Sequence, residues 1–138
     1  MIVLDTNVLS ETLRPKPSTR VLEWLRSRPS AALFTTSISE AEIHLGVELL
    51  PAGRRRSALE SAIAQIFEAD MSGRVLPFES AAAREFAVLV ADRRRGGKPM
   101  SQADAQIAAI VRSRGAALAT RNVADFSAAG FEIVDPWQ

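Results

Sequence analysis

Short apolar runs alternate along the chain with longer stretches in which apolar residues recur every three or four positions. A short apolar run bounded by polar residues is typical of a strand buried in a parallel sheet, whereas the longer spacing is typical of amphipathic helices. The runs predict strands at residues 2–4, 32–35, 75–78, 116–119 and 131–134. The amphipathic stretches, bounded by cap residues, proline or glycine, predict helices at 8–13, 18–28, 37–50, 54–70, 80–95 and 102–114.

The order of these elements indicates the fold class. Strands alternate with helices, and a parallel strand can follow its neighbour only after a crossover, usually through a helix. We therefore predict an α/β fold of three layers, α/β/α, with a central, mainly parallel sheet flanked by helices. The length of 138 residues fits one domain over 1–138, and no internal repeat or linker divides the chain.

Composition excludes several kinds of chemistry. The chain has no cysteine, so disulfides, thiol nucleophiles and thiolate metal sites are absent. Hydrophobic residues make up 47% and charged residues 24%, as in ordinary soluble proteins, and no apolar run approaches membrane-spanning length. We expect a soluble, cytoplasmic protein. The single histidine, His44, argues against histidine-pair ribonuclease chemistry, and we interpret it as a structural or surface residue.

Acidic residues at predicted strand and helix ends are the candidates for chemistry. Asp5 directly follows the first strand, and ligands in open α/β sheets bind at that carboxyl edge. Asp104 lies in the first turn of the helix that Ser101 opens, where it could be only part of a capping box. Glu42 borders the apolar side of its helix, with Glu40 as the competing candidate.

The segment after the fourth strand adds two further candidates. Asn122 and Asp125, in the predicted loop 120–125, can both offer oxygen ligands. Carboxylates gathered at one sheet edge without His or Cys are suited to Mg²⁺ or Mn²⁺. Such a metal can activate a water and neutralise charge on a phosphodiester during in-line displacement. An aspartyl phosphatase is a poor alternative, because position 7, two residues after Asp5, is Asn7 and not a second acid.

Basic residues offer a possible substrate footprint. Arg93, Arg94, Arg95 and Lys98 concentrate positive charge at a helix end, where they could contact phosphates or only complement the helix dipole. For the run 54–56 we favour solvated helix termini. Aromatic residues do not alternate with these runs, so base stacking is not predicted. Thr6 could hydrogen-bond near the metal or the scissile phosphate, although capping of the first helix is the simpler interpretation.

Four sequence motifs, taken in order, resemble a known family. The motifs are Leu-Asp-Thr-Asn at 4–7, Ala-Glu and Leu-Gly-Val at 41–47, Ala-Asp-Ala-Gln-Ile-Ala-Ala at 103–109, and Thr-Arg-Asn with Asp-Phe at 120–126. Together they resemble the PIN domain of the VapC/FitB-like toxins, which belong to type II (VapBC) toxin–antitoxin systems. The resemblance spans the whole chain, including the last four residues.

The resemblance implies a magnesium-dependent endoribonuclease, for which Mn²⁺ is a possible substitute, with RNA as substrate. It also implies a VapB/FitA-like antitoxin that neutralises the toxin, a homodimer, and larger complexes that reach operator DNA only through the antitoxin. By position, Asp5 and Asp104 match the family's central metal-binding acids, and Glu42 matches its helix acid.

The chain departs from the family at the fourth acid. Many relatives have an acid where Asn122 stands, and here the nearest carboxylate is Asp125. Either Asn122 orders a water through its amide, or Asp125 takes over the position. The departure leaves a second function open: a catalytically weak PIN-like module that acts in a DNA-bound regulatory complex.

Overall fold

The computed structural model describes all residues 1–138 and contains a five-stranded sheet in which every pairing is parallel. Its strands are β1 (Ile2–Leu4), β2 (Leu33–Thr36), β3 (Val75–Leu76), β4 (Ala117–Ala119) and β5 (Ile133–Val134). All five predicted strands are confirmed, several of them one or two residues shorter than expected. The spatial order β3-β2-β1-β4-β5 places β1 at the centre. Strands β2 and β3 follow on one side of β1, and β4 and β5 follow on its other side. The carboxyl ends of β1 and β4 therefore form a topological switch point, where the strand order reverses.

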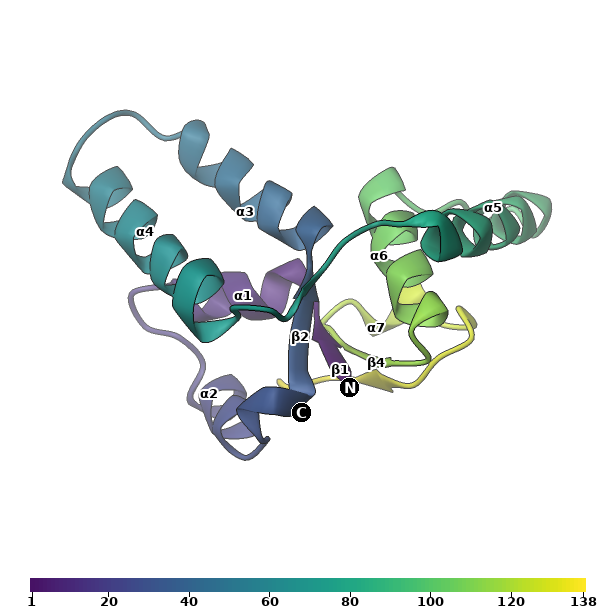
Figure 1. The fold of residues 1–138 in the computed structure, drawn as a ribbon, viewed down its shortest axis with the longest axis horizontal. Helices are drawn as coiled ribbons and strands as arrows, with labels where there is room; N and C mark the ends of the chain where they lie inside the picture. The colour runs from purple at the N-terminus through teal and green to yellow at the C-terminus, as the bar shows by residue number, and fades with distance from the viewer.

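Helices cover both faces of the sheet, which confirms the three-layer α/β/α prediction (Figure 1). Neighbouring residues of β1 and β4 point to opposite faces, and each face has its own apolar core. Val3 and Leu118 belong to the core under α5, α6 and α7, while Leu4 and Ala119 belong to the core on the other face. The helices of the first group are α5 (Ser80–Arg95), α6 (Gln102–Ser113) and α7 (Val123–Phe126). Those of the second are α1 (Thr6–Thr12), α2 (Thr19–Arg26), α3 (Ser37–Glu48) and α4 (Arg54–Ala64).

The N-cap of α1 corrects the interpretation of Thr6 as a cap, and the N-cap of α3 is likewise the residue at a strand end. Helix α1 begins at Thr6, and its cap is Asp5, whose side chain accepts the Thr6 N–H at 2.8 Å. Helix α3 begins at Ser37, and its cap is Thr36, which accepts the Ser39 N–H at 3.1 Å. Each strand runs straight into its helix, so the residue at the strand end replaces a separate turn residue as the cap. The predicted cap Ser101 of α6 is confirmed, and Ser18, the first residue of the predicted helix 18–28, caps α2.

Two further segments differ from expectation. The predicted helix at 54–70 exists, but its last turns, Gln65–Asp70, adopt the wider π-helical winding. Helices α3 and α4 form the expected hairpin (Figure 1). The predicted loop 120–125 contains most of α7, a helix of four residues. So short a helix shows no apolar periodicity, which is why the sequence pattern misses it. No helix combines the length and apolar character needed to cross a membrane.

Candidate functional site

Asp5 lies at the switch point, with its carboxylate held at both oxygens. Its backbone N–H donates to the Ala119 carbonyl of β4 at 2.9 Å. Oδ1 accepts the Thr6 N–H at 2.8 Å, and Oδ2 accepts the Thr120 hydroxyl at 2.7 Å. The Asn7 amide nitrogen lies 3.4 Å from Oδ2. The residue is only 3% exposed, so these bonds fix the orientation of a buried carboxylate at the sheet edge.

Thr6, the residue after Asp5, connects Glu42 to the switch point. Its hydroxyl lies 2.7 Å from Glu42 Oε1, to which it donates, and 2.9 Å from the hydroxyl of Ser39. Capping of α1 by Thr6 is therefore wrong, since Asp5 is the cap. Because Glu42 and Ser39 both lie on α3, Thr6 fixes the start of α1 against this helix. The oxygen Oε2 of Glu42 has no hydrogen-bond partner within the protein.

Asp104, in the first turn of α6, completes the acidic group. The Asp104 N–H donates to the Ser101 hydroxyl at 3.1 Å. Burial raises the pKa of Asp104 above its ordinary value, the charges of Asp125 and Glu42 raise it further, and a hydrogen bond with Ser101 opposes them. Burial likewise raises the pKa of Asp5, against the hydrogen bonds of Thr120 and Thr6, and the charges of Asp104 and Glu42 add to the rise. The structure therefore brings Asp5, Glu42 and Asp104 within electrostatic range of one another.

This acidic group lacks cationic partners. None of the four carboxylates of Asp5, Glu42, Asp104 and Asp125 forms an ion pair with Lys or Arg. An all-oxygen donor set that carries mutual repulsion fits a hard divalent cation. No three acidic or histidine side chains lie close enough to ligate one ion directly. The arrangement fits Mg²⁺, which commonly binds through one or two carboxylates and keeps several waters.

The segment after β4 places the two candidates for the fourth acid differently. Asn122 donates its N–H to the Thr120 hydroxyl at 3.0 Å, and its exposed side chain does not cap α7. Asp125 acts electrostatically on Asp104, and both line an open pocket of about 380 Å³. Of the two, Asp125 is the one whose charge acts on the acidic group.

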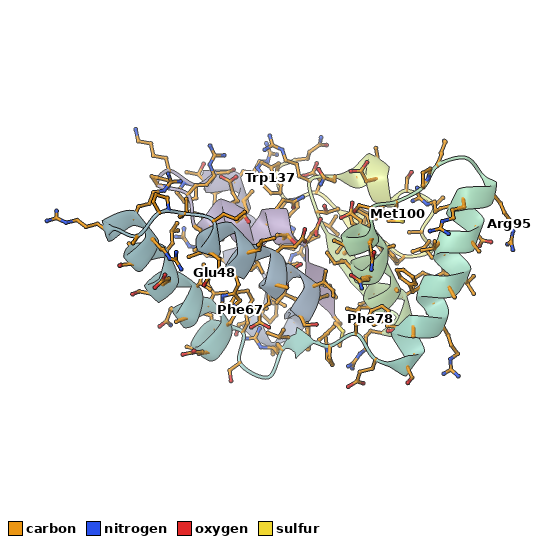
Figure 2. All side chains as sticks on the ribbon, turned by 90° about the horizontal axis from the view of Figure 1, so that it is seen from above. Glu48, Phe67, Phe78, Arg95, Met100 and Trp137 are labelled. Atoms are coloured by element: carbon orange, nitrogen blue, oxygen red, sulfur yellow. The ribbon has the colours of Figure 1, made fainter.

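Of the four basic candidates, two line the pocket of Asp104 and two do not. Arg93 and Lys98 line the same pocket as Asp104. Arg93 Nη2 donates to the carbonyls of Asp125 at 3.0 Å and Ser127 at 2.7 Å, which ties α7 to α5. Arg95 instead pairs with Asp92 at 3.4 Å, at the outer end of α5 (Figure 2). Arg94 is exposed.

The turn after α5 places Lys98. Gly97 adopts a φ of +69°, in the left-handed region that favours glycine, and the Lys98 N–H returns to the Arg93 carbonyl at 2.9 Å. This turn brings Lys98 to the pocket that Asp104 also lines.

Three residues at the site are not among the candidates predicted from the sequence. Thr120 is fully buried and bonds both Asp5 and the Asn122 backbone, while Ser39 and Asn7 contact the acid-bearing segment. Asn7 and Thr120 lie in the motifs at 4–7 and 120–126, which could have indicated them, whereas Ser39 lies in no motif. His44 is exposed and lies 5.8 Å from the Phe67 ring, outside the acidic group.

Comparison with known proteins places the chain in a family. The PIN domain profile matches residues 2–132. The chain is 38% identical over 138 residues to VapC ribonuclease Y4jK of Sinorhizobium fredii, covering 100% of this chain and 99% of the relative. It is 37% identical to Toxin FitB of Neisseria gonorrhoeae over 99% of both proteins. Among solved structures, FitAB bound to a DNA fragment superposes with a TM-score of 0.93 at 37% identity, covering 100% of this chain and 96% of the other. The chain therefore belongs to the PIN domain family and, within it, to the VapC and FitB toxins.

Proposed function

We propose that this protein is a metal-dependent endoribonuclease, the toxin of a VapBC-type pair, and that a VapB/FitA-like antitoxin neutralises it. The observation that carries the proposal is the group Asp5, Glu42 and Asp104, gathered at the topological switch point without a cationic partner. The similarity to a protein named as a VapC ribonuclease supports RNA as the substrate.

In this proposal Asp5 and Asp104 hold the ion, with Glu42 as a further ligand or a water-orienting group. Bound Mg²⁺ or Mn²⁺ would supply a Lewis acid for the scissile phosphate and lower the pKa of an attacking water. The chain provides orientation: Thr120 and the Thr6 N–H hold the Asp5 carboxylate. Glu42, bonded to Thr6 only through Oε1, offers its other oxygen to the water. Lys98 lies where it can stabilise negative charge that develops on the phosphate.

The antitoxin proposal rests on two structural neighbours, FitAB bound to a DNA fragment and DNA-bound VapBC from Salmonella typhimurium, which are 37% and 27% identical to this chain. We propose that operator DNA reaches this toxin only through the antitoxin. An open groove of about 590 Å³ between α1, α3 and α4 contains Glu42 among apolar residues that include Leu13, Ile43 and Leu59. A segment seated there would cover Glu42. Leu45 and Leu49, 59% and 76% exposed on α3, are candidate contacts for the antitoxin or for a homodimer.

The test is cleavage of a mixed RNA pool in Mg²⁺, Mn²⁺ or EDTA by wild type and Asp5→Asn. Asn is as good an N-cap as Asp, so the variant keeps the start of α1. We expect EDTA-sensitive cleavage that falls at least about 100-fold in the variant, since altering even the partners of metal ligands costs 10–100-fold. Asp92→Asn, an exposed carboxylate on α5, is the matched control and should cleave like wild type. Equal cleavage by Asp5→Asn and wild type would refute the proposed site. Absence of metal-dependent cleavage by wild type would favour the regulatory module.

The fourth acid gives a separate prediction. We expect Asp125→Asn to lower cleavage about 10-fold or more, because it removes a charge coupled to Asp104 beside the proposed ion. Asp92→Asn is again the matched control, since Asp92 is exposed on α5 and does not act on Asp104. Asn122→Asp should lower the Mg²⁺ concentration for half-maximal cleavage and restore part of the activity of Asp125→Asn. The prediction fails if Asp125→Asn and Asp92→Asn cleave alike across a Mg²⁺ titration.

A further inference from the structure

Arg121 lies beside the acidic group and is stacked on an aromatic ring. Its backbone N–H donates to Asn7 Oδ1 at 3.3 Å, and the same Asn7 side chain lies 3.4 Å from Asp5 Oδ2. The guanidinium carbon of Arg121 is 5.0 Å from the centroid of the Trp137 ring. Trp137 lies beside α1, the helix that Asp5 caps (Figure 2). The Arg121 backbone therefore adjoins the Asp5 segment, while its guanidinium lies over the Trp137 ring and acts electrostatically on Glu11 of α1.

The ring of Trp137 is supported by the protein core. The Trp137 side chain packs against the core on the α1 face of the sheet, and its backbone N–H donates to Asp135 Oδ1 at 2.9 Å. The core packing supports the Trp137 ring, and the guanidinium of the exposed Arg121 lies over it. Arg121 is exposed and lies within ion-pair distance of no carboxylate, although its charge acts on Glu11 of α1. The Arg121 side chain is therefore accessible from solvent.

The chemistry of such a surface favours an unpaired nucleobase. Bases of single-stranded RNA stack on aromatic rings and on guanidinium planes, whatever their sequence. We propose that Arg121, supported by Trp137, is a base-stacking platform for a nucleotide next to the scissile phosphate, so that the substrate is RNA in which at least one base is unstacked. The platform rests on the proposed ribonuclease function and adds the structural class of its substrate. Sequence patterning predicts no base stacking, because Arg121 and Trp137 meet only in the folded chain.

A second pair in the same protein provides a matched control. The guanidinium carbon of Arg28 lies 5.1 Å from the centroid of the Trp24 ring. Trp24 lies on α2 and Arg28 just beyond its end, and neither residue bonds to the acid-bearing segments. The two pairs share their chemistry and stacking distance and differ in location. Loss of Arg28 should therefore leave RNA binding unchanged.

The test measures binding of a short labelled single-stranded RNA in EDTA by fluorescence anisotropy, with a second oligonucleotide that has the same backbone and abasic sites. We expect wild type to bind the abasic RNA about tenfold more weakly, the size of one base-stacking interaction. Arg121→Ala should bind intact RNA about tenfold more weakly and lose this preference, Arg121→Lys should recover only part of the affinity, and Arg28→Ala should match wild type. In Trp24→Phe, where Trp137 is the single tryptophan, intact RNA should change the indole fluorescence and abasic RNA should not.

Two outcomes overturn the platform. The first is equal affinity of wild type for intact and abasic RNA, which needs no substitution at Arg121 and so does not depend on folding of a variant. The second is full recovery by Arg121→Lys, which would reduce Arg121 to a phosphate contact. Binding in EDTA is measured separately from cleavage. If either outcome occurs while metal-dependent cleavage is observed, the platform is refuted and the proposed nuclease function stands. Base-dependent binding without any metal-dependent cleavage would refute the proposed nuclease function.

Discussion

Asp104→Asn should lower metal-dependent RNA cleavage at least about 100-fold and should also stabilise the metal-free protein. The two effects share one cause. Asp104 is held near Glu42 and Asp125 in a partly buried position, where its negative charge is unfavourable unless a cation is bound. The substitution removes this charge and keeps the size and the backbone N–H that bonds to Ser101.

The pH dependence fixes the sign of the stability effect. Folding raises the pKa of Asp104 above its ordinary value of 3.8, so the folded state holds its proton to higher pH than the unfolded state. The free energy of unfolding of metal-free wild type therefore falls as the pH rises from about 3.8 through the raised pKa, and remains lower above it. Asp104→Asn lacks this loss. Thermal unfolding in EDTA should give wild type and variant similar stability at low pH and a more stable variant at pH 7.

Addition of Mg²⁺ at pH 7 should make wild type more stable than Asp104→Asn, the reverse of their order in EDTA. An ion that binds only the folded state stabilises it by about 2.7 kcal/mol at 100 times its dissociation constant. We expect this gain for wild type and for Asp92→Asn, and little gain for Asp104→Asn. A variant that loses cleavage but gains as much stability from Mg²⁺ as wild type would show that Asp104 does not hold the ion. A variant less stable than wild type in EDTA at pH 7 would show that the Asp104 charge is not unfavourable in the fold.

The parts of the site that the sequence predicts are those fixed by a strand or a helix boundary. Asp5 follows a short apolar run, and Asp104 follows a serine cap, so local patterning alone predicts both at element ends. The structure places both within electrostatic range of Glu42. Glu42 itself is favoured over Glu40 only by the family resemblance, because each is compatible with the apolar pattern of α3.

Contacts between distant segments cannot be predicted in this way. Thr120 bonds Asp5 because β4 pairs with β1, and the pairing order of strands is not encoded in any local pattern. Arg93 of α5 bonds the carbonyls of Asp125 and Ser127, which lie 32 and 34 residues further along the chain. The cap at Thr36 escapes prediction for a local reason: Thr36, Ser37 and Ser39 are all suitable cap residues, and Thr36 also fits the end of the strand.

Helix α7 shows how a core residue can support the site, and Phe126→Ala should have the largest effect on stability among these substitutions. Phe126 is fully buried in the core under α5 and α6, and it directly follows Asp125. Truncation of a buried Phe costs about 3–5 kcal/mol, from lost burial and the cavity that remains. The remaining anchor of α7 is the pair of Arg93 hydrogen bonds, so the position of Asp125 should also loosen.

Urea unfolding with cleavage assays in parallel separates the two effects of Phe126→Ala. Phe78→Ala is the matched control, because Phe78 is partly buried against the same core and packs on Phe86 of α5, away from α7. We expect a smaller loss of stability for Phe78→Ala and unchanged cleavage per folded molecule. Phe126→Ala should lose cleavage beyond its folded fraction and require more Mg²⁺ for half-maximal rate. If both variants cleave like wild type per folded molecule, α7 does not position Asp125 for the reaction, and the acids on β1, α3 and α6 act without it.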